Sequence, residues 1–236
     1  MPRGTISSQL RRMRRDWDRR ALENARCYVA TGREDWSDAE FFQYGEMELA
    51  EQVLNDLDNI CQGMDPKAMK VLEIGCGAGR VTRALARFFG EVYAVDISRQ
   101  MVRQTRLALA DFPTAHIFHN NGKDLSVVRR RWWHRFGLGQ KFQLDFAFSC
   151  LVFQHIPSRE VIESYLREVN RLLRPGALFK FQVQGSPVGE SNLDDSWIGL
   201  SLTEQDARVL AQQTGFDLRH QHGAGSQYYW LWFFKK

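Results

Sequence analysis

The sequence predicts an α/β fold in which a mostly parallel seven-stranded sheet ends in an antiparallel hairpin and carries helices on both faces. Three observations support this prediction. From residue 70 onward, short apolar runs alternate with amphipathic helical stretches, which is the order of βα units in a parallel sheet. The apolar runs are mostly continuous, as expected for strands covered on both faces. The last two runs are separated only by Gly223-Ala224-Gly225, and so short a connection joins antiparallel strands.

Residues 1–62 predict a helical cap ahead of the main domain, which spans residues 63–236. A polar helix over 7–30 carries a thin apolar stripe and stops at a glycine, the common helix terminator. Ser37 and the glutamate three residues later have the form of a capping box, and a second helix follows over 39–60.

The main domain supplies the strands and further helices in alternating order. Strands are predicted over 71–74, 91–95, 116–119, 144–149, 177–183, 216–222 and 228–234. Helices are predicted over 81–89, 98–110, 126–135, 159–173 and 203–214. Arg174-Pro175-Gly176 predicts a break between the fourth of these helices and the fifth strand. We expect the aromatic residues of the last strand to form core rather than a stacking surface for bases.

Composition limits the classes of function. The chain has 236 residues, 44% of them hydrophobic, and a net charge of +4. This length suits one α/β domain with an appendage. Basic residues concentrate in residues 1–20, with seven Arg against two Asp, and again in residues 129–135. We interpret both clusters as solvated basic faces, with an anionic partner such as nucleic acid as the alternative.

The cysteines and the absence of long apolar runs predict the compartment. Four dispersed cysteines form no C-x-x-C pair, which argues against a disulfide framework or a zinc site and fits a reducing compartment. We expect no bound metal. No apolar run approaches the ~18 residues that span a bilayer, and the N-terminus lacks the apolar core of a secretory signal. We therefore expect a cytoplasmic protein without a membrane span. A transit peptide in the Arg-rich opening is the weaker alternative.

A glycine turn between an apolar strand and a helix is the most informative motif. Gly75-Cys76-Gly77-Ala78-Gly79 lets the backbone turn sharply and approach a ligand. The helix that follows presents unpaired N–H groups. Asp96 ends the next strand, where a carboxylate commonly binds a ribose diol. The motif predicts a pocket for an adenosine-containing cofactor, while capping of the following helix is the alternative role for Asp96.

The identity of the cofactor follows from what the turn lacks. Arg80 stands where a dinucleotide fingerprint needs its third glycine, and the Gly-Lys-Ser/Thr ending of a phosphate-binding loop is absent. Glu73 places negative charge in the strand just before the turn, which disfavours a pyrophosphate and favours a ligand with a positive end. S-adenosylmethionine combines a ribose diol, an adenine and a cationic amino-acid part, so it meets all these conditions.

Five motifs in order, followed by the terminal hairpin, resemble the class I S-adenosylmethionine-dependent methyltransferases over residues 40–236. The motifs run from Val71 to Gly79, Val92 to Ser98, Asn120 to Leu125, Leu144 to Ser149 and Leu172 to Ala177. The resemblance implies a Rossmann-like sheet, S-adenosylmethionine as cofactor and a site at the carboxyl ends of the strands.

The resemblance also implies roles for the residues around the first two strands. Gly75, Gly77 and Gly79 approach the methionine part with bare backbone, and Glu73 lies beneath them. Asp96 accepts both ribose hydroxyls, since one carboxylate accepts two donors at once.

Later motifs complete the implied site. Ile97 and Met101 pack on the adenine ring, and Asn121 stands where the family commonly has an aspartate that accepts from the adenine amine. Ser149 and Cys150 face the sulfonium. The predicted cofactor-binding set is Glu73, Gly75, Cys76, Gly77, Gly79, Asp96, Ile97, Met101, Asn121, Gly122, Ser149 and Cys150.

Methyl transfer from a sulfonium depends mainly on aligning acceptor, methyl carbon and sulfur in a dry pocket. A base is needed only where the acceptor must lose a proton. His155, just past the fourth strand, is the candidate catalytic base, with a structural role as the alternative. We expect the N-terminal cap, notably residues 41–46, together with residues 126–141 and 185–199, to shape the acceptor pocket.

The sequence thus predicts S-adenosylmethionine-dependent methyl transfer to a small or medium-sized molecule. One alternative is a nucleic-acid (tRNA or rRNA) methyltransferase, favoured by the two basic segments, although Ser149-Cys150-Leu151-Val152 replaces the Asn/Asp-Pro-Pro-Tyr/Phe loop of many amino-methylating enzymes. A non-catalytic S-adenosylmethionine-binding protein is the second alternative, and a dehydrogenase is a distant third. The sequence leaves the acceptor, the attacked atom and the oligomeric state open.

Overall fold

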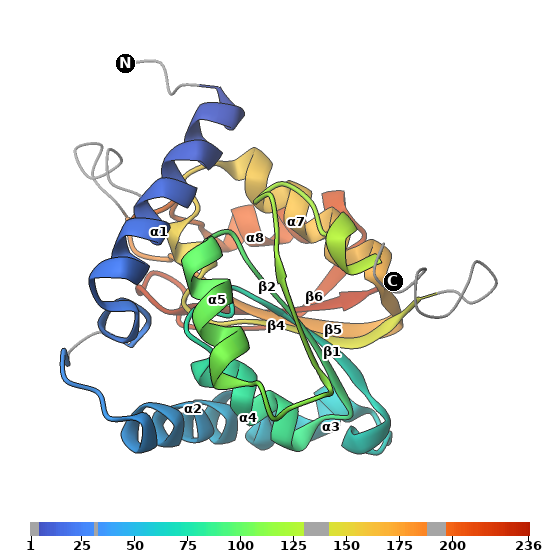
Figure 1. The fold of residues 1–236 in the computed structure, drawn as a ribbon. Helices are drawn as coiled ribbons and strands as arrows, with labels where there is room; N and C mark the ends of the chain where they lie inside the picture. Colours follow the sequence, from blue (N-terminus) through green and yellow to red (C-terminus); the bar gives the residue numbers. More distant parts are fainter. Residues whose placement is uncertain (1–4, 31–32, 130–141, 188–196) are drawn as a thin grey trace.

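The computed structural model describes residues 5–30, 33–129, 142–187 and 197–236. Their strands form one seven-stranded sheet in the order β3-β2-β1-β4-β5-β7-β6 (Figure 1). β1 to β5 run parallel, and β7 lies antiparallel to both β5 and β6, so the predicted sheet with its terminal hairpin is confirmed. The strands are β1 (Lys70–Ile74), β2 (Glu91–Asp96), β3 (Ala115–His119), β4 (Leu144–Ser149), β5 (Leu173–Val183), β6 (Phe216–His222) and β7 (Tyr229–Lys235).

Helices cover both faces of this sheet. One layer holds α2 (Asp38–Gln52), α3 (Leu57–Cys61), α4 (Arg80–Phe88) and α5 (Arg99–Ala108), and the other holds α7 (Arg159–Leu172) and α8 (Glu204–Thr214). Successive strand residues point to opposite faces. On β1, Val71 packs in the first layer, whereas Leu72 and Ile74 pack in the second. This double burial explains why the strands are continuous apolar runs.

The terminal strand is core, as predicted, because Tyr229, Leu231 and Phe233 are fully buried in the α7–α8 layer. Of the helix predicted over 126–135, residues 126–129 are helical and the remainder lies outside the described residues. Among the described helices, none is both long and apolar enough to cross a bilayer.

The first helix, α1 (Ile6–Val29), lies beside α5, and its buried Leu10 and Met13 join the core cluster of the sheet residues Leu72 and Ile74 (Figure 1). The carboxylate of Asp18 accepts hydrogen bonds from the Ser98 hydroxyl (2.7 Å) and from the Gln100 amide (3.2 Å), both at the start of α5. The Gln104 side chain donates to the Ala21 carbonyl (3.0 Å). These bonds fix α1 across the end of α5 that follows β2.

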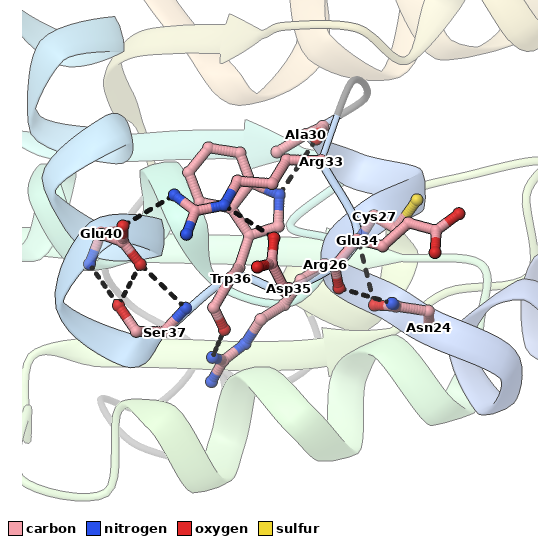
Figure 2. Close-up of polar contacts among 10 residues, drawn as sticks. All are labelled: Asn24, Arg26, Cys27, Ala30, Arg33, Glu34, Asp35, Trp36, Ser37 and Glu40. Carbon is pink, nitrogen blue, oxygen red and sulfur yellow. Dashed lines mark hydrogen bonds and ion pairs between the residues drawn. The ribbon is translucent and has the colours of Figure 1, made fainter.

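A kink near the end of α1 sets the direction of its last turn. Asn24 has non-helical dihedrals (φ −165°, ψ 86°), and its side chain accepts from the Cys27 amide and donates to the Glu34 carbonyl (Figure 2). Beyond the kink, the predicted capping box of α2 is confirmed, with the Ser37 hydroxyl and the Glu40 carboxylate bonding each other's backbone amides.

The single helix predicted over 39–60 is wrong, because the chain breaks at Val53 into α2, a 3₁₀ turn and α3. The Gln52 carbonyl accepts from the buried Nζ of Lys180 on β5 (2.6 Å). The same ammonium pairs with Asp56 (3.0 Å) and lies over the Trp232 ring (4.4 Å). Binding this buried ammonium takes the carbonyl out of the helical ladder. The domain boundary at residue 62 stays a prediction.

The break predicted at Arg174-Pro175-Gly176 lies inside a strand instead of before one. β5 begins at Leu173, and its pairing with β4 shifts from Leu144↔Leu173 to Phe146↔Leu178. The additional residues form a bulge in which Gly176 adopts a left-handed φ of +76°. Proline and glycine are tolerated here because a bulge leaves their backbone groups outside the ladder.

We expect Lys180→Met to lower the free energy of unfolding by about 2–4 kcal/mol, because it leaves the Asp56 carboxylate without its cationic partner in a largely buried setting. Urea unfolding followed by circular dichroism measures the change. The matched control is Arg208→Ala, which breaks an exposed pair with Glu204 and should cost less than about 1 kcal/mol. Equal losses in the two variants would contradict a structural role for the Lys180–Asp56 pair.

Candidate active site at the carboxyl ends of the central strands

A cavity of about 450 Å³ lies at the carboxyl ends of β1, β2 and β4. The strand order reverses between β1 and β4, and open α/β sheets bind ligands at such a switch point. Its walls come from the loop after β1, the end of β2, the loop after β4 and the inner face of α1. The volume lies in the range of small-molecule sites.

The glycine loop forms the floor of this cavity and has no room for side chains. Gly75 (φ +83°) would place a Cβ 2.1 Å from Val152, and Gly77 (φ +51°) would place one 2.8 Å from Val29. Both glycines and Cys76 line the cavity. Gly79 (φ +89°) instead caps the start of α4 and lies outside the lining.

Asp96 holds the loop from the end of β2. Its carboxylate accepts from the Gly77 amide (3.0 Å) and from the Ser98 amide (2.8 Å), and burial raises its pKa to about 6. Ser98 itself caps α5 with its hydroxyl, so Asp96 is not the cap residue. Ile97 and Met101 line the same side of the cavity. This side can therefore offer a carboxylate and an apolar surface to one ligand.

Glu73 is buried beneath the loop, with 4% of its surface exposed. Burial raises its pKa to about 8, although Thr82 and Arg80 oppose the shift. Its Oε2 has no hydrogen-bond partner among the described residues, and the side chain lines the cavity. An unpartnered buried carboxyl is costly. It fits a ligand that brings a positive group, as the sequence predicts.

The loop after β3 places a different asparagine at the cavity. Asn121 faces away, because its side chain bonds Asp124 and the amides of Lys123 and Asp124. Neither Asn121 nor Gly122 belongs to the lining, whereas Asn120 does and donates to the Tyr165 hydroxyl (2.8 Å). The sequence could not show which of the two adjacent asparagines lines the cavity, because this depends on the conformation of the turn after β3.

The end of β4 separates the two residues predicted to face the reacting group. The Ser149 hydroxyl is fully buried and donates to the Ile74 carbonyl (2.8 Å), which ties β4 to β1 behind the cavity. Cys150 lines the cavity, and its thiol donates to the Glu48 carboxylate (3.1 Å). Burial, ahead of the charge of Glu48, raises the pKa of this thiol well above its usual value.

His155 borders the cavity but is firmly held. Its Nδ1 contacts the Trp197 carbonyl, so the geometry assigns the proton to Nδ1. Nε2 then accepts from the side-chain Nε2 of Gln154 (3.2 Å). The ring lies 5.1 Å from the rings of both Trp17 and Trp197. A base at Nε2 would have to exchange the Gln154 bond for a substrate bond.

The N-terminal cap contributes to the cavity lining through α1, a part of the cap that the sequence did not single out. Met13 and Trp17, and beyond the kink Tyr28 and Val29, line the cavity. The apolar stripe of the predicted helix over 7–30 indicated that one face is buried, but it did not indicate that this face borders the cavity. Of the segments expected to shape the acceptor pocket, residues 41–46 do not line it. Parts of 185–199 do, at Ser186, Pro187, Trp197 and Ile198, whereas most of 126–141 lies outside the described residues.

Comparison with known proteins identifies relatives of the central region. Residues 72–179 match the sequence profile of a family described as a methyltransferase domain. The ubiquinone biosynthesis O-methyltransferase of Xanthomonas oryzae pv. oryzae is 27% identical over 124 residues, which are 51% of this chain and 45% of that protein. The chain thus spans about half the length of this curated relative.

Two further similarities extend over more of the chain. A Streptomyces venezuelae dTDP-3-amino-3,4,6-trideoxy-alpha-D-glucopyranose N,N-dimethyltransferase is 20% identical over 158 residues, covering 67% of this chain and 59% of that protein. The crystal structure of magnesium protoporphyrin IX methyltransferase from Synechocystis PCC 6803, with bound S-adenosylhomocysteine, superposes with a TM-score of 0.63 at 16% identity. That superposition covers 94% of this chain and 98% of the other.

We expect Glu73→Gln to remove a pH dependence from the stability of the ligand-free protein. The folded protein binds the Glu73 proton more tightly than the unfolded chain, so stability is full below pH 4.5 and falls as pH rises toward 8. Above that range the variant should be more stable than the wild type by up to about 5 kcal/mol. Chemical unfolding from pH 5 to 9 measures the difference.

The control for this prediction is Glu204→Gln, an exposed carboxylate on α8. Its effect on the free energy of unfolding should not change over the same pH range. A difference between wild type and Glu73→Gln that is the same at every pH would show that Glu73 does not titrate in this interval.

Proposed function

We propose that this chain is a class I S-adenosylmethionine-dependent methyltransferase that transfers a methyl group from S-adenosylmethionine to a small or medium-sized molecule; the methyltransferase-domain profile over residues 72–179 and the Rossmann-like sheet support this proposal. One observation carries the proposal. The backbone of the glycine loop, the Asp96 carboxylate and the unpartnered, buried Glu73 carboxyl all line a single cavity at the switch point of the sheet. This donor and acceptor set is complementary to the adenosine and cationic parts of that cofactor.

The residues present fit this cofactor along the length of the cavity. Asp96 keeps lone pairs for the ribose hydroxyls beyond its two backbone bonds. Ile97 and Met101 supply the surface for the adenine ring, and Glu73 the charge for the amino-acid end. The bound sulfonium brings its own leaving group, so the protein needs to align the acceptor and exclude water.

The part of the cavity beyond the glycine loop suits a small acceptor. Tyr28, Trp197 and Tyr228 provide aromatic walls, and Gln154 and Gln227 provide uncharged hydrogen-bonding groups. A concave site with aromatic walls and a few polar groups suits a single small molecule. The two curated relatives are named as an O- and an N,N-dimethyltransferase, so we propose oxygen or nitrogen as the attacked atom.

A nucleic-acid substrate is the second candidate, and a specific surface favours it. Arg11, Arg15 and Arg19 are exposed at every fourth residue of α1, and the adjacent helix α5 exposes Arg99, Arg103 and Arg106. Binding of tRNA that weakens steeply with salt would support this candidate. We also propose a cytoplasmic location, which the four free cysteines support.

We expect S-adenosylhomocysteine to raise the melting temperature of the protein and NAD to leave it unchanged, because the loop has Arg80 where a dinucleotide site needs glycine. Differential scanning fluorimetry measures both shifts, and transfer of label from [methyl-³H]S-adenosylmethionine into acceptor extracts tests turnover. Stabilisation without any transfer would favour a non-catalytic binding protein. A shift with NAD alone would overturn the proposed cofactor.

We propose that His155 acts as general base where the acceptor must lose a proton. His155→Asn keeps a donor for the Trp197 carbonyl but removes the Nε2 lone pair. It should lower kcat about 100-fold, abolish the acidic limb of the pH–rate profile and change the Kd for S-adenosylhomocysteine less than about threefold. A parallel loss of cofactor affinity and kcat would instead assign His155 a structural role.

A further inference from the structure

A buried arginine adjoins the cofactor loop, and no motif assigns it a role. Arg80 is the first residue of α4, with only 6% of its side chain exposed, yet it lines the same cavity as Glu73 and Cys150. A buried charge is costly unless it is paired and hydrogen-bonded. Its charge is paired with Glu48, so the question is what its remaining N–H donors bind at the edge of the glycine loop.

α2 holds this guanidinium in place. The Glu48 carboxylate accepts from Nη1 of Arg80 (3.3 Å), and the Tyr44 ring lies 4.8 Å below the guanidinium. The helices approach closely at Gly45, where a Cβ would lie 2.0 Å from the Arg80 carbonyl oxygen. The second oxygen of Glu48 accepts from the Cys150 thiol. Glu48 thus orients two cavity residues at once.

The contacts recorded within the described residues use only one nitrogen of the guanidinium, which has five N–H donors in all. No hydrogen bond or ion pair joins Arg80 to Glu73 in this part of the structure, although both line the cavity. A cavity that presents a guanidinium and a carboxyl separately is complementary to a zwitterion. An amino acid, with its ammonium and carboxylate on one carbon, is such a group.

We propose that Arg80, oriented by Glu48 and Tyr44, binds the carboxylate of the amino-acid part of the cofactor, while Glu73 faces its ammonium. This inference rests on the proposed function and adds a ligand contact to it. Arginine suits this role because its planar guanidinium can donate two parallel hydrogen bonds to a carboxylate while another N–H keeps its bond to Glu48.

Three ligands and matched variants test the proposal by isothermal titration calorimetry. S-adenosylhomocysteine carries the full amino acid, its decarboxylated analogue retains only the amine, and methylthioadenosine lacks both. Arg80→Met should weaken binding of S-adenosylhomocysteine about 10- to 100-fold. It should leave binding of the other two ligands within about twofold, and Arg80→Lys should recover part of the loss.

Arg83→Met is the control, since Arg83 lies on the same helix, stacks on Phe42 and does not line the cavity. It should leave all three affinities unchanged. Equal losses of all three ligands in Arg80→Met, or no loss of any, would overturn the assignment. Failure of the wild type to bind any of the three would overturn the proposed function itself.

Discussion

The loop after β1 fits between α1 and the loop after β4 only because Gly75 and Gly77 carry no side chain. A Cβ at either position would overlap Val152 or Val29, and both glycines have left-handed dihedrals. This close approach directs the Gly77 amide to Asp96 and places Glu73 and Arg80 at the edges of one cavity. The remaining walls of the cavity therefore pack around a loop that has no room for side chains at Gly75 and Gly77.

The same cavity concentrates ionisable groups that a stable core would avoid. Glu73 and Asp96 are buried enough for their pKa values to rise, and Arg80 is buried with a single carboxylate partner. Such groups reduce stability unless something pairs with them. The Lys180–Asp56 pair at the C-terminal end of α2 differs, because its ammonium bonds protein groups, including the Gln52 carbonyl. We infer that the first set awaits a ligand, whereas the second holds the fold.

Features set by neighbouring residues could be predicted from the sequence. The strands, the glycine turn and the capping box at Ser37 depend on local pattern, and each is found, although β5 begins earlier than predicted. Features set by distant residues could not. The break at Val53 depends on Lys180, far along the chain, and the inward position of Asn120 rather than Asn121 depends on the turn after β3 and on Tyr165. The sequence contains these residues but does not show which of them contact one another in the fold.

The residues that line the cavity fall into two groups, those within the region that matches the methyltransferase profile and those outside it. The glycine loop, Asp96, Cys150 and His155 lie within residues 72–179, the region that matches the methyltransferase profile. Trp17, Tyr28, Trp197 and Tyr228 lie outside it, as does Glu48. We infer that the proposed cofactor end of the cavity lies largely within the profile, whereas segments beyond it contribute most of the aromatic wall proposed for the acceptor. For this reason the named acceptors of the relatives do not transfer to this chain, and its own acceptor must be sought with the aromatic wall of α1 in place.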